Sequence, residues 1–284
     1  MSSGSTRHQH RAPLSEAVLA DTLLARSGLY TGISVVELTG STNADLLAAA
    51  RSGAAAGRVL VAEEQTAGRG RLNRSWQSES GASLTFSVLL RPSGVPAASR
   101  GWLPLLAGVA TVSALREQTG LEVRLKWPND VLAGEPAGGT GASGGAGKLA
   151  GILAEQAGDA IVVGIGLNVS ATEAELPAGP ATSLFLAGVA QPDRQAILIG
   201  VLTEMENWYL RWTGGPRPGD AEACGLRESY LAWCATIGRD VRVEMPGGTT
   251  LTGRASDVDG AGRLLVIASD GVHAISAGDV VHVR

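Results

Sequence analysis

The sequence has few of the residues from which metal sites, disulfide scaffolds and nucleophilic catalytic centres are built. Among its 284 residues are 2 cysteines, Cys224 and Cys234, and 4 histidines, at positions 8, 10, 273 and 282. The cysteines form no CxxC pair and have no histidine beside them, so neither a zinc site nor a disulfide scaffold is expected. Because the histidines lie near the two ends, the central region offers no Ser-His-Asp or Cys-His arrangement.

A long apolar run and an excess of positive charge are also missing. No stretch approaches the roughly 18 apolar residues of a membrane-spanning helix, and the polar N-terminus lacks an apolar signal segment. The net charge of -4 argues against a broad basic surface for nucleic acid. We therefore expect a soluble cytoplasmic protein that contacts neither DNA nor a membrane, in which any anion site is local.

One local basic segment is present, close to residue 70. Arg69, Arg71 and Arg74 fall within six residues, separated in part by glycines and followed by Trp76. Glycine lets a backbone fold closely around a ligand, and the arginine fork matches carboxylates and phosphates. The segment is interpreted as a loop that closes over an anionic ligand, although an exposed basic turn would contain the same residue types.

The hydrophobic pattern predicts a chain that mixes helices and strands. Helices are expected over 13–27, 46–51, 102–118, 193–212 and 221–234, and strands over 33–38, 59–63, 83–90, 122–127, 149–155 and 160–168. The strand over 83–90 should be half-buried, and the aromatic stripe of the helix over 193–212 is interpreted as core packing. Thr42 and Asp45 have the spacing of a capping box. Beyond Ile237, closely spaced strands and turns predict a small β-barrel.

Two glycine motifs look like nucleotide-binding fingerprints but fail on their context. Gly147-Lys148 would need glycine at position 142 and a hydroxyl residue at 149, and a strand follows where a phosphate loop requires a helix. Gly164-Ile165-Gly166 lacks the third glycine of a dinucleotide fingerprint. Glycines within a strand indicate the close approach of a ligand or another backbone. The glycine-rich segment over 134–147 is expected to be a flexible loop joining two strands.

Five segments together resemble the motifs of the biotin protein ligases, although each alone has a structural explanation. They are 41–43 (STN), 65–71 (QTAGRGR), 126–130 (KWPND), 148–152 (KLAGI) and 164–168 (GIGLN). Their order and spacing agree with the family, and the resemblance covers about residues 30 to 284. It implies an α+β fold, with a central mixed β-sheet and flanking helices of the class II synthetase and lipoate-ligase type. A small SH3-like β-barrel at the C-terminus completes the implied fold.

The resemblance also implies an activity and its partners. Such an enzyme uses Mg-ATP to activate biotin as biotinyl-5'-AMP, then transfers it to a lysine of a biotin carboxyl carrier domain in a biotin-dependent carboxylase. We expect a disordered tail over 1–12, a catalytic domain over 13–220, and a connecting helix with the barrel over 221–284. A lipoate ligase or octanoyltransferase of the same fold is the nearest alternative. A non-catalytic nucleotide- or DNA-binding regulator is another.

Residue roles follow from the same resemblance. The implied biotin-binding residues are Ser41, Thr42, Asn43, Gln65, Gly68, Arg69, Arg71, Lys148 and Gly151. The implied ATP- and adenylate-binding residues are Arg71, Arg74, Trp76, Asn129, Lys148 and Asn168. Lys148, Arg69 and Arg71 would be catalytic, with Lys148 bridging the biotin carboxylate and the α-phosphate. Trp76 would stack on adenine, and Asp130 would help to hold Mg²⁺.

Two departures from the family pattern fall in loops. The family usually has glycine where this chain has Asn73, and the segment over 134–147 is longer than usual. The basic loop is expected to be mobile without ligand. Only about thirty residues precede the first predicted strand, which leaves no room for the N-terminal DNA-binding domain of ligases that are also repressors. We therefore expect no operator binding.

Overall fold

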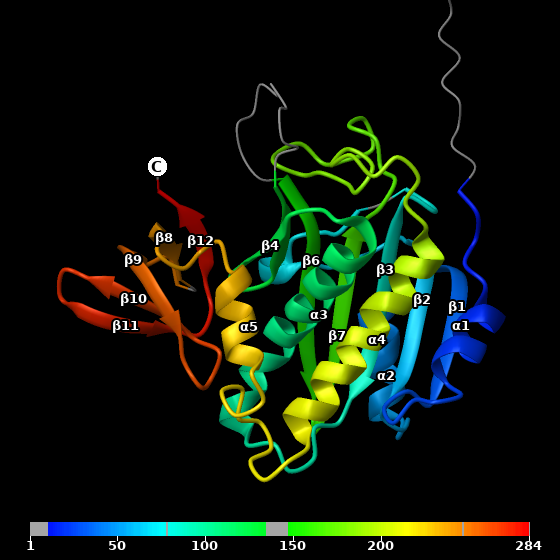
Figure 1. Ribbon diagram of the computed structural model, residues 1–284, viewed down its shortest axis with the longest axis horizontal. Helices are drawn as coiled ribbons and strands as arrows, with labels where there is room; N and C mark the ends of the chain where they lie inside the picture. Colours follow the sequence, from blue (N-terminus) through cyan, green and yellow to red (C-terminus); the bar gives the residue numbers. More distant parts are fainter. Residues whose placement is uncertain (1–10, 78, 135–146, 246, 284) are drawn as a thin grey trace, which may run out of the picture.

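The computed structural model describes residues 11–77, 79–134, 147–245 and 247–283 (Figure 1). Most of the expected N-terminal tail and most of the expected glycine-rich loop over 134–147 lie outside these ranges. Within them, no helix is long and apolar enough to cross a membrane.

A seven-stranded mixed sheet forms the centre of the molecule, in the order β1-β2-β3-β7-β6-β5-β4. β1 and β2 pair in parallel, and every other neighbouring pair in this sheet is antiparallel. The strands are β1 (Gly32–Thr39), β2 (Arg58–Gln65), β3 (Ser83–Leu90), β4 (Val123–Lys126), β5 (Asp130–Ala133), β6 (Gly147–Ala157) and β7 (Ala160–Asn168). This architecture confirms the predicted fold class.

Helices cover both faces of the sheet (Figure 1). They are α1 (Glu16–Leu23), α2 (Thr42–Arg51), α3 (Trp102–Thr119), α4 (Arg194–Thr213) and α5 (Leu226–Trp233), with short 3₁₀ turns η1 (Arg71–Asn73) and η2 (Ala97–Gly101). On β3, Phe86 and Val88 belong to the core cluster that contains α3 and α4. Leu89, one residue further on, packs in a separate cluster with α2. Successive residues of a strand face opposite sides, so α2 lies on the face away from α3 and α4.

The hydrophobic pattern explains the two long helices. The α4 stripe at Ile197, Val201, Met205, Trp208 and Trp212 is buried, which confirms its interpretation as core packing. α3 is apolar on most of its surface because α4, α5 and the sheet surround it. It ends at Gly120, whose φ of 68° is the left-handed conformation that glycine tolerates at a helix C-terminus.

Several local predictions were wrong. β3 was expected to be half-buried, but all its residues are buried because helices pack on both of its faces. The cap of α2 is Ser41 rather than Thr42, since the Ser41 hydroxyl accepts a hydrogen bond from the Ala44 N–H. The helices expected over 13–27 and 221–234 are each eight residues long, and β5 was not anticipated.

A second sheet at the C-terminus is antiparallel, with the order β11-β10-β9-β8-β12, and fits a small barrel-like domain. Its strands are β8 (Asp240–Glu244), β9 (Thr250–Val258), β10 (Leu264–Ala268), β11 (Gly271–Ile275) and β12 (Asp279–His282). It adjoins the β4 end of the central sheet (Figure 1). The Ala235 N–H donates to the Leu125 carbonyl at 2.7 Å, and the Trp127 N–H donates to Thr236 Oγ1 at 3.1 Å. These bonds tie the segment that leads into the second sheet to the end of β4 and to the residue that follows it.

Candidate active site

Small residues on one face of the central sheet form the floor of a cavity. On β7, Ala160 and Val162 pack against α2, and Gly164 and Gly166 continue the same alternation beyond the start of that helix. Gly166 pairs with Gly151 of β6. A Cβ atom at Gly166 would lie 2.3 Å from the Trp76 ring, so the absence of a side chain allows the indole to rest on the floor. The glycines do mark a close approach, but the group that approaches Gly166 is the Trp76 side chain, whereas a ligand or another backbone was predicted.

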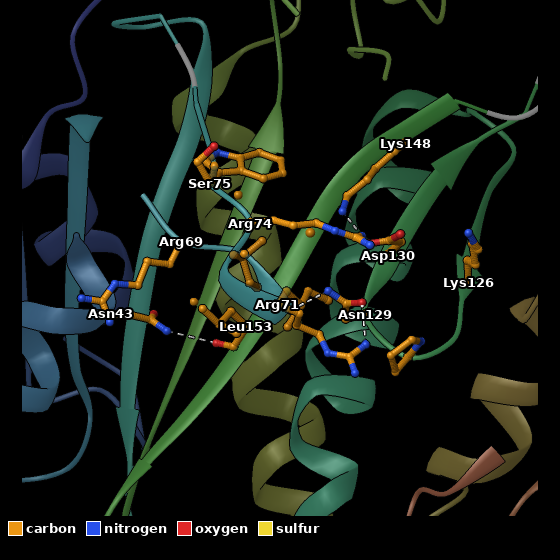
Figure 2. A pocket seen from close by; sticks show the side chains of 18 of the residues that line it. Asn43, Arg69, Arg71, Arg74, Ser75, Lys126, Asn129, Asp130, Lys148 and Leu153 are labelled. Atoms are coloured by element: carbon orange, nitrogen blue, oxygen red, sulfur yellow. Dashed lines mark hydrogen bonds and ion pairs between the residues drawn. The ribbon is translucent and has the colours of Figure 1, made fainter. Parts of the chain in front are cut away.

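One end of the cavity is lined by the start of α2 and the end of β2. The Thr42 N–H donates to Gln65 Oε1 at 2.8 Å, and Thr42 Oγ1 lies 2.7 Å from Ser87 Oγ. Asn43 is buried behind Thr42, and its Nδ2 donates to the Leu153 carbonyl at 3.2 Å (Figure 2). Within the described residues, Gln65 Nε2 donates no hydrogen bond, which leaves it available to a ligand. This end is therefore a polar, hydrogen-bonding subsite.

The basic loop closes over the floor as a narrow hairpin. The Gly70 N–H donates to the Arg74 carbonyl at 2.6 Å, and the Trp76 N–H donates to the Gly68 carbonyl at 2.8 Å. Leu72 at the tip has a φ of 53°, a conformation that costs a leucine about 1–2 kcal/mol. Leu72 is thus a left-handed residue of this loop that the sequence did not indicate. Whether the loop is mobile without ligand stays a prediction.

The opposite end of the cavity is cationic. Lys148 Nζ lies 2.6 Å from Asp130 Oδ1, and Arg71 Nη1 donates to Asn129 Oδ1 at 3.3 Å (Figure 2). Arg74 pairs with Asp279, the first residue of β12 in the second sheet. The C-terminal domain therefore contributes to this cationic end of the cavity, which is called the cationic wall below.

Burial lowers the pKa of two cationic side chains of the cavity, Lys126 and Arg71. It lowers the pKa of Lys126 below its ordinary value; Asp130 opposes this shift, while Lys148 and Arg74 add to it. It also lowers the pKa of Arg71, where the negative charge of Asp130 again acts in the opposite direction and raises the pKa. Several positive charges held close together in a partly dry site are stabilised when an anion binds among them.

Most of the predicted site residues line this single cavity of about 250 Å³. They are Ser41, Thr42, Asn43, Gln65, Arg69, Arg71, Arg74, Trp76, Asn129, Asp130, Lys148 and Gly151. Two lie elsewhere. Gly68 lines a neighbouring groove that shares several loop residues with the cavity. Asn168 is buried with its amide committed to Ser83 and the Thr182 carbonyl, away from the cavity.

Sequence reasoning missed three contributors. Lys126 lies in the KWPND segment but received no role, although it lines the cavity. Ser87 is buried behind Thr42 in a strand that reads as ordinary core. Asp279 belongs to a segment that was interpreted only as a turn of the barrel. For Lys126 the motif itself was the signal; Asp279 has none, because its contact lies far away in the sequence.

The cavity defines the class of protein. It joins a polar subsite to a cationic one across a glycine floor, and no histidine or cysteine in the described part of the chain lines it. Among the described residues, no group of three or more His, Cys, Asp or Glu side chains could hold a metal ion. Fixed cations of this kind stabilise negative charge without a covalent side chain. The molecule is an α+β enzyme built to bring anionic groups together.

Comparison with known proteins identifies the family. Residues 35–170 match the biotin/lipoate A/B protein ligase family, and residues 236–283 match the biotin protein ligase C-terminal domain. The chain is 43% identical to a biotin–[acetyl-CoA-carboxylase] ligase of Mycobacterium tuberculosis, over 98% of this chain and 99% of the relative. It is 31% identical to the bifunctional ligase/repressor BirA of Bacillus subtilis, over 81% of this chain and 68% of the relative.

A solved structure agrees with the sequence relatives. The biotin protein ligase from Aquifex aeolicus in complex with biotin and ATP superposes with a TM-score of 0.71 at 27% identity, covering 90% of this chain and 100% of that one. The chain belongs to the biotin protein ligase family.

Proposed function

We propose that the protein is an ATP-dependent ligase that activates biotin as biotinyl-5'-AMP and transfers the biotinyl group to a lysine of a biotin carboxyl carrier domain. The observation that carries the proposal is the single cavity in which the polar subsite, the glycine floor and the cationic wall meet. Membership of the family indicates which ligands bind, and the regions of the cavity suit the different parts of these ligands.

In the first step, a carboxylate oxygen of biotin attacks the α-phosphorus of ATP, and the bond to the β-phosphate oxygen breaks to release pyrophosphate. Both reactants are anions, so much of the barrier is electrostatic repulsion. Lys148 is the residue for this task, because its ammonium lines the cavity next to Asp130, at the cationic end. A Cβ at Gly151 would lie 3.3 Å from Lys148 Nζ, so Gly151 keeps the ammonium low over the floor.

Asp130 holds Lys148 until the substrates arrive. Their ion pair is partly exposed, at 36% for the lysine side chain and 20% for the aspartate, so the ammonium can exchange one anion for another. Arg71 and Arg74 approach from the loop and meet the phosphates. The bicyclic head of biotin occupies the polar subsite formed by Ser41, Thr42 and Gln65.

Magnesium accompanies ATP in such reactions, and the residues present fit it. Mg²⁺ takes one or two protein carboxylates and completes its shell with phosphate oxygens and water. Asp130 is the carboxylate that would hold it, and Asp279 lines the same cavity. The ion, when bound, neutralises phosphate charge.

In the second step, the amine of the acceptor lysine attacks the acyl carbon of biotinyl-5'-AMP, AMP leaves, and the nitrogen loses a proton. The mixed anhydride hydrolyses if water reaches it. The hairpin of the basic loop, with Trp76 lying on the floor, excludes water until the acceptor arrives.

The test is covalent transfer to an isolated carrier domain. Purified protein with biotin, Mg-ATP and the carrier domain should add one biotinyl group to the acceptor lysine, as measured by intact mass. A carrier domain with that lysine changed to arginine should stay unmodified. Lipoate in place of biotin should give no product. Failure with biotin, or equal labelling with lipoate, would refute the proposal.

A further inference from the structure

The buried amide of Asn43 has partners that determine its orientation. Nδ2 donates to the Leu153 carbonyl at 3.2 Å and to Glu155 Oε2 at 2.8 Å, both on β6. A carbonyl and an ionised carboxylate can only accept, so the nitrogen of the amide must face them. The oxygen therefore points the other way, toward Ser87.

The orientation of the Asn43 amide determines the direction of the hydroxyl protons between Asn43 and the cavity. Ser87 Oγ donates its single proton to Asn43 Oδ1 at 2.6 Å. Ser87 then accepts across its 2.7 Å contact with Thr42 Oγ1, so Thr42 donates to it. Thr42 Oγ1 also lies 3.1 Å from Gln65 Oε1, which can only accept, so two acceptors share the Thr42 proton. With that proton committed within the protein, the Thr42 hydroxyl has only lone pairs left for a ligand. Gln65 Oε1 already accepts from the Thr42 N–H, which leaves Gln65 Nε2 as a donor.

Gly164 makes room for this chain of bonds. A Cβ atom there would lie 2.1 Å from Asn43 Oδ1 and 3.2 Å from Ser87 Oγ. Asn43, Thr42 and Ser87 are each at most 4% exposed, so water does not compete for their hydrogen bonds. Glu155 of β6 is the outer end of this series of hydrogen bonds. Its side chain is half-buried and does not line the main cavity.

We propose that Glu155 is a positioning residue for the polar subsite: by holding the Asn43 amide in one orientation, it sets the direction of the Ser87 and Thr42 protons. The subsite then offers a hydroxyl acceptor from Thr42 and an amide donor from Gln65. Such a pair suits a head group that carries both N–H donors and a carbonyl acceptor. The inference rests on the proposed function, in which that head group is the ring system of biotin.

Without Glu155, the Asn43 amide keeps only its bond of 3.2 Å to the Leu153 carbonyl and is held less firmly in this orientation. The terminal torsion of an asparagine side chain is broad, so a half-turn that exchanges Oδ1 and Nδ2 costs little by itself. A rotated amide would donate to Ser87, Ser87 would donate to Thr42, and the Thr42 hydroxyl would point its own proton elsewhere. The Thr42 hydroxyl would then no longer be a fixed acceptor beside the Gln65 amide donor.

The experiment measures biotin binding by isothermal titration calorimetry without ATP, and the ATP KM in biotin-dependent exchange. The variants are Glu155→Ala, Glu155→Gln, Asn43→Ala and the double variant Glu155→Ala/Asn43→Ala. Glu117→Ala is the control for charge, because Glu117 is an exposed carboxylate on α3. Glu155→Leu replaces Glu155→Ala if the latter does not fold, since it lacks the acceptor but keeps most of the volume.

Glu155→Ala should weaken biotin binding about tenfold, the effect of losing one charge-assisted hydrogen bond, with the ATP KM unchanged. Glu155→Gln should stay within about threefold of the parent, because its amide oxygen still accepts. The double variant should be no worse than Asn43→Ala, since Glu155 acts through Asn43.

Unchanged biotin binding in Glu155→Ala, equal damage in Glu155→Gln, or additive losses in the double variant would each overturn the inference. An effect that changed ATP and biotin alike would identify a general structural role instead, and would also overturn it. If the parent protein bound no biotin, the proposed function itself would fail, which is a distinguishable result.

Discussion

The ion pair between Arg74 and Asp279 connects the basic loop to the C-terminal domain, and its removal has a predictable consequence. The Arg74 side chain is 66% exposed and the Asp279 side chain 21%, so solvent screens the pair substantially. Exposed pairs contribute about 0.2–1 kcal/mol. A second link, from Arg71 Nη1 to the Gly278 carbonyl at 3.4 Å, remains when Asp279 is changed.

Asp279→Ala should therefore loosen the loop without releasing it. A loss of about 0.5–1 kcal/mol corresponds to a two- to fivefold shift toward the open loop. Two amides report on closure directly, because the Gly70 N–H bonds to the Arg74 carbonyl and the Trp76 N–H bonds to the Gly68 carbonyl. Hydrogen exchange at both should accelerate by that factor in the unliganded protein.

Two comparisons make this result specific. Asp270→Ala removes an exposed carboxylate from the same small sheet, where its partner is His273, and should leave the loop amides unchanged. In 1 M salt the parent protein should approach the exchange rates of Asp279→Ala, because the pair is screened. Unaltered exchange in Asp279→Ala, or an equal change in Asp270→Ala, would refute the idea that the C-terminal domain latches the loop.

Three further predictions concern the same cavity. Bound phosphates favour protonated Lys126, whose pKa in the free protein is lowered by burial. At pH values around that lowered pKa, ATP binding should therefore take up protons, and binding should weaken as the pH rises through that pKa. Calorimetry in buffers of different ionisation enthalpy measures the uptake, and Lys126→Arg should abolish it. Leu72→Gly should relieve the left-handed strain and slow hydrogen exchange in the loop, whereas Leu72→Ile should accelerate it. Gly166→Ala should displace the Trp76 ring and reduce adenylation more than tenfold, while Gly32→Ala, where an added Cβ meets nothing within 4 Å, should have no effect on adenylation.

Elements with a strong local pattern were predictable from the sequence. β3 and β7 have the bounds that their apolar runs predict, and α4 agrees within one residue at each end. β5 was missed because its four residues directly follow Pro128 and Asn129. These residue types indicate a turn, and a strand of four residues is too short to show a clear pattern of its own beside it. The cap at Ser41 was placed one residue late, because both Ser41 and Thr42 carry a hydroxyl suited to capping.

The site could be predicted only where a motif marked it. Lys148, Asn129 and the loop arginines meet in one cavity as the resemblance implied. Asn168 shares a motif with the glycine floor, but it pairs with Ser83 across β3, and its amide is used to fix the chain after β7. Asp279 could not be found, because an ion pair between separate domains leaves no pattern in either local sequence. The domain boundaries expected at residues 12 and 220 stay predictions.

Biotin-dependent exchange of pyrophosphate into ATP tests the central claim most directly, because it reports formation of the adenylate alone. The parent protein should exchange pyrophosphate with biotin and not with lipoate. Lys148→Ala should slow exchange by at least about a hundredfold while changing ATP binding only a few-fold, as expected for a residue that acts mainly in the transition state. Absence of biotin-dependent exchange, or equal losses of exchange and ATP binding in Lys148→Ala, would contradict the account.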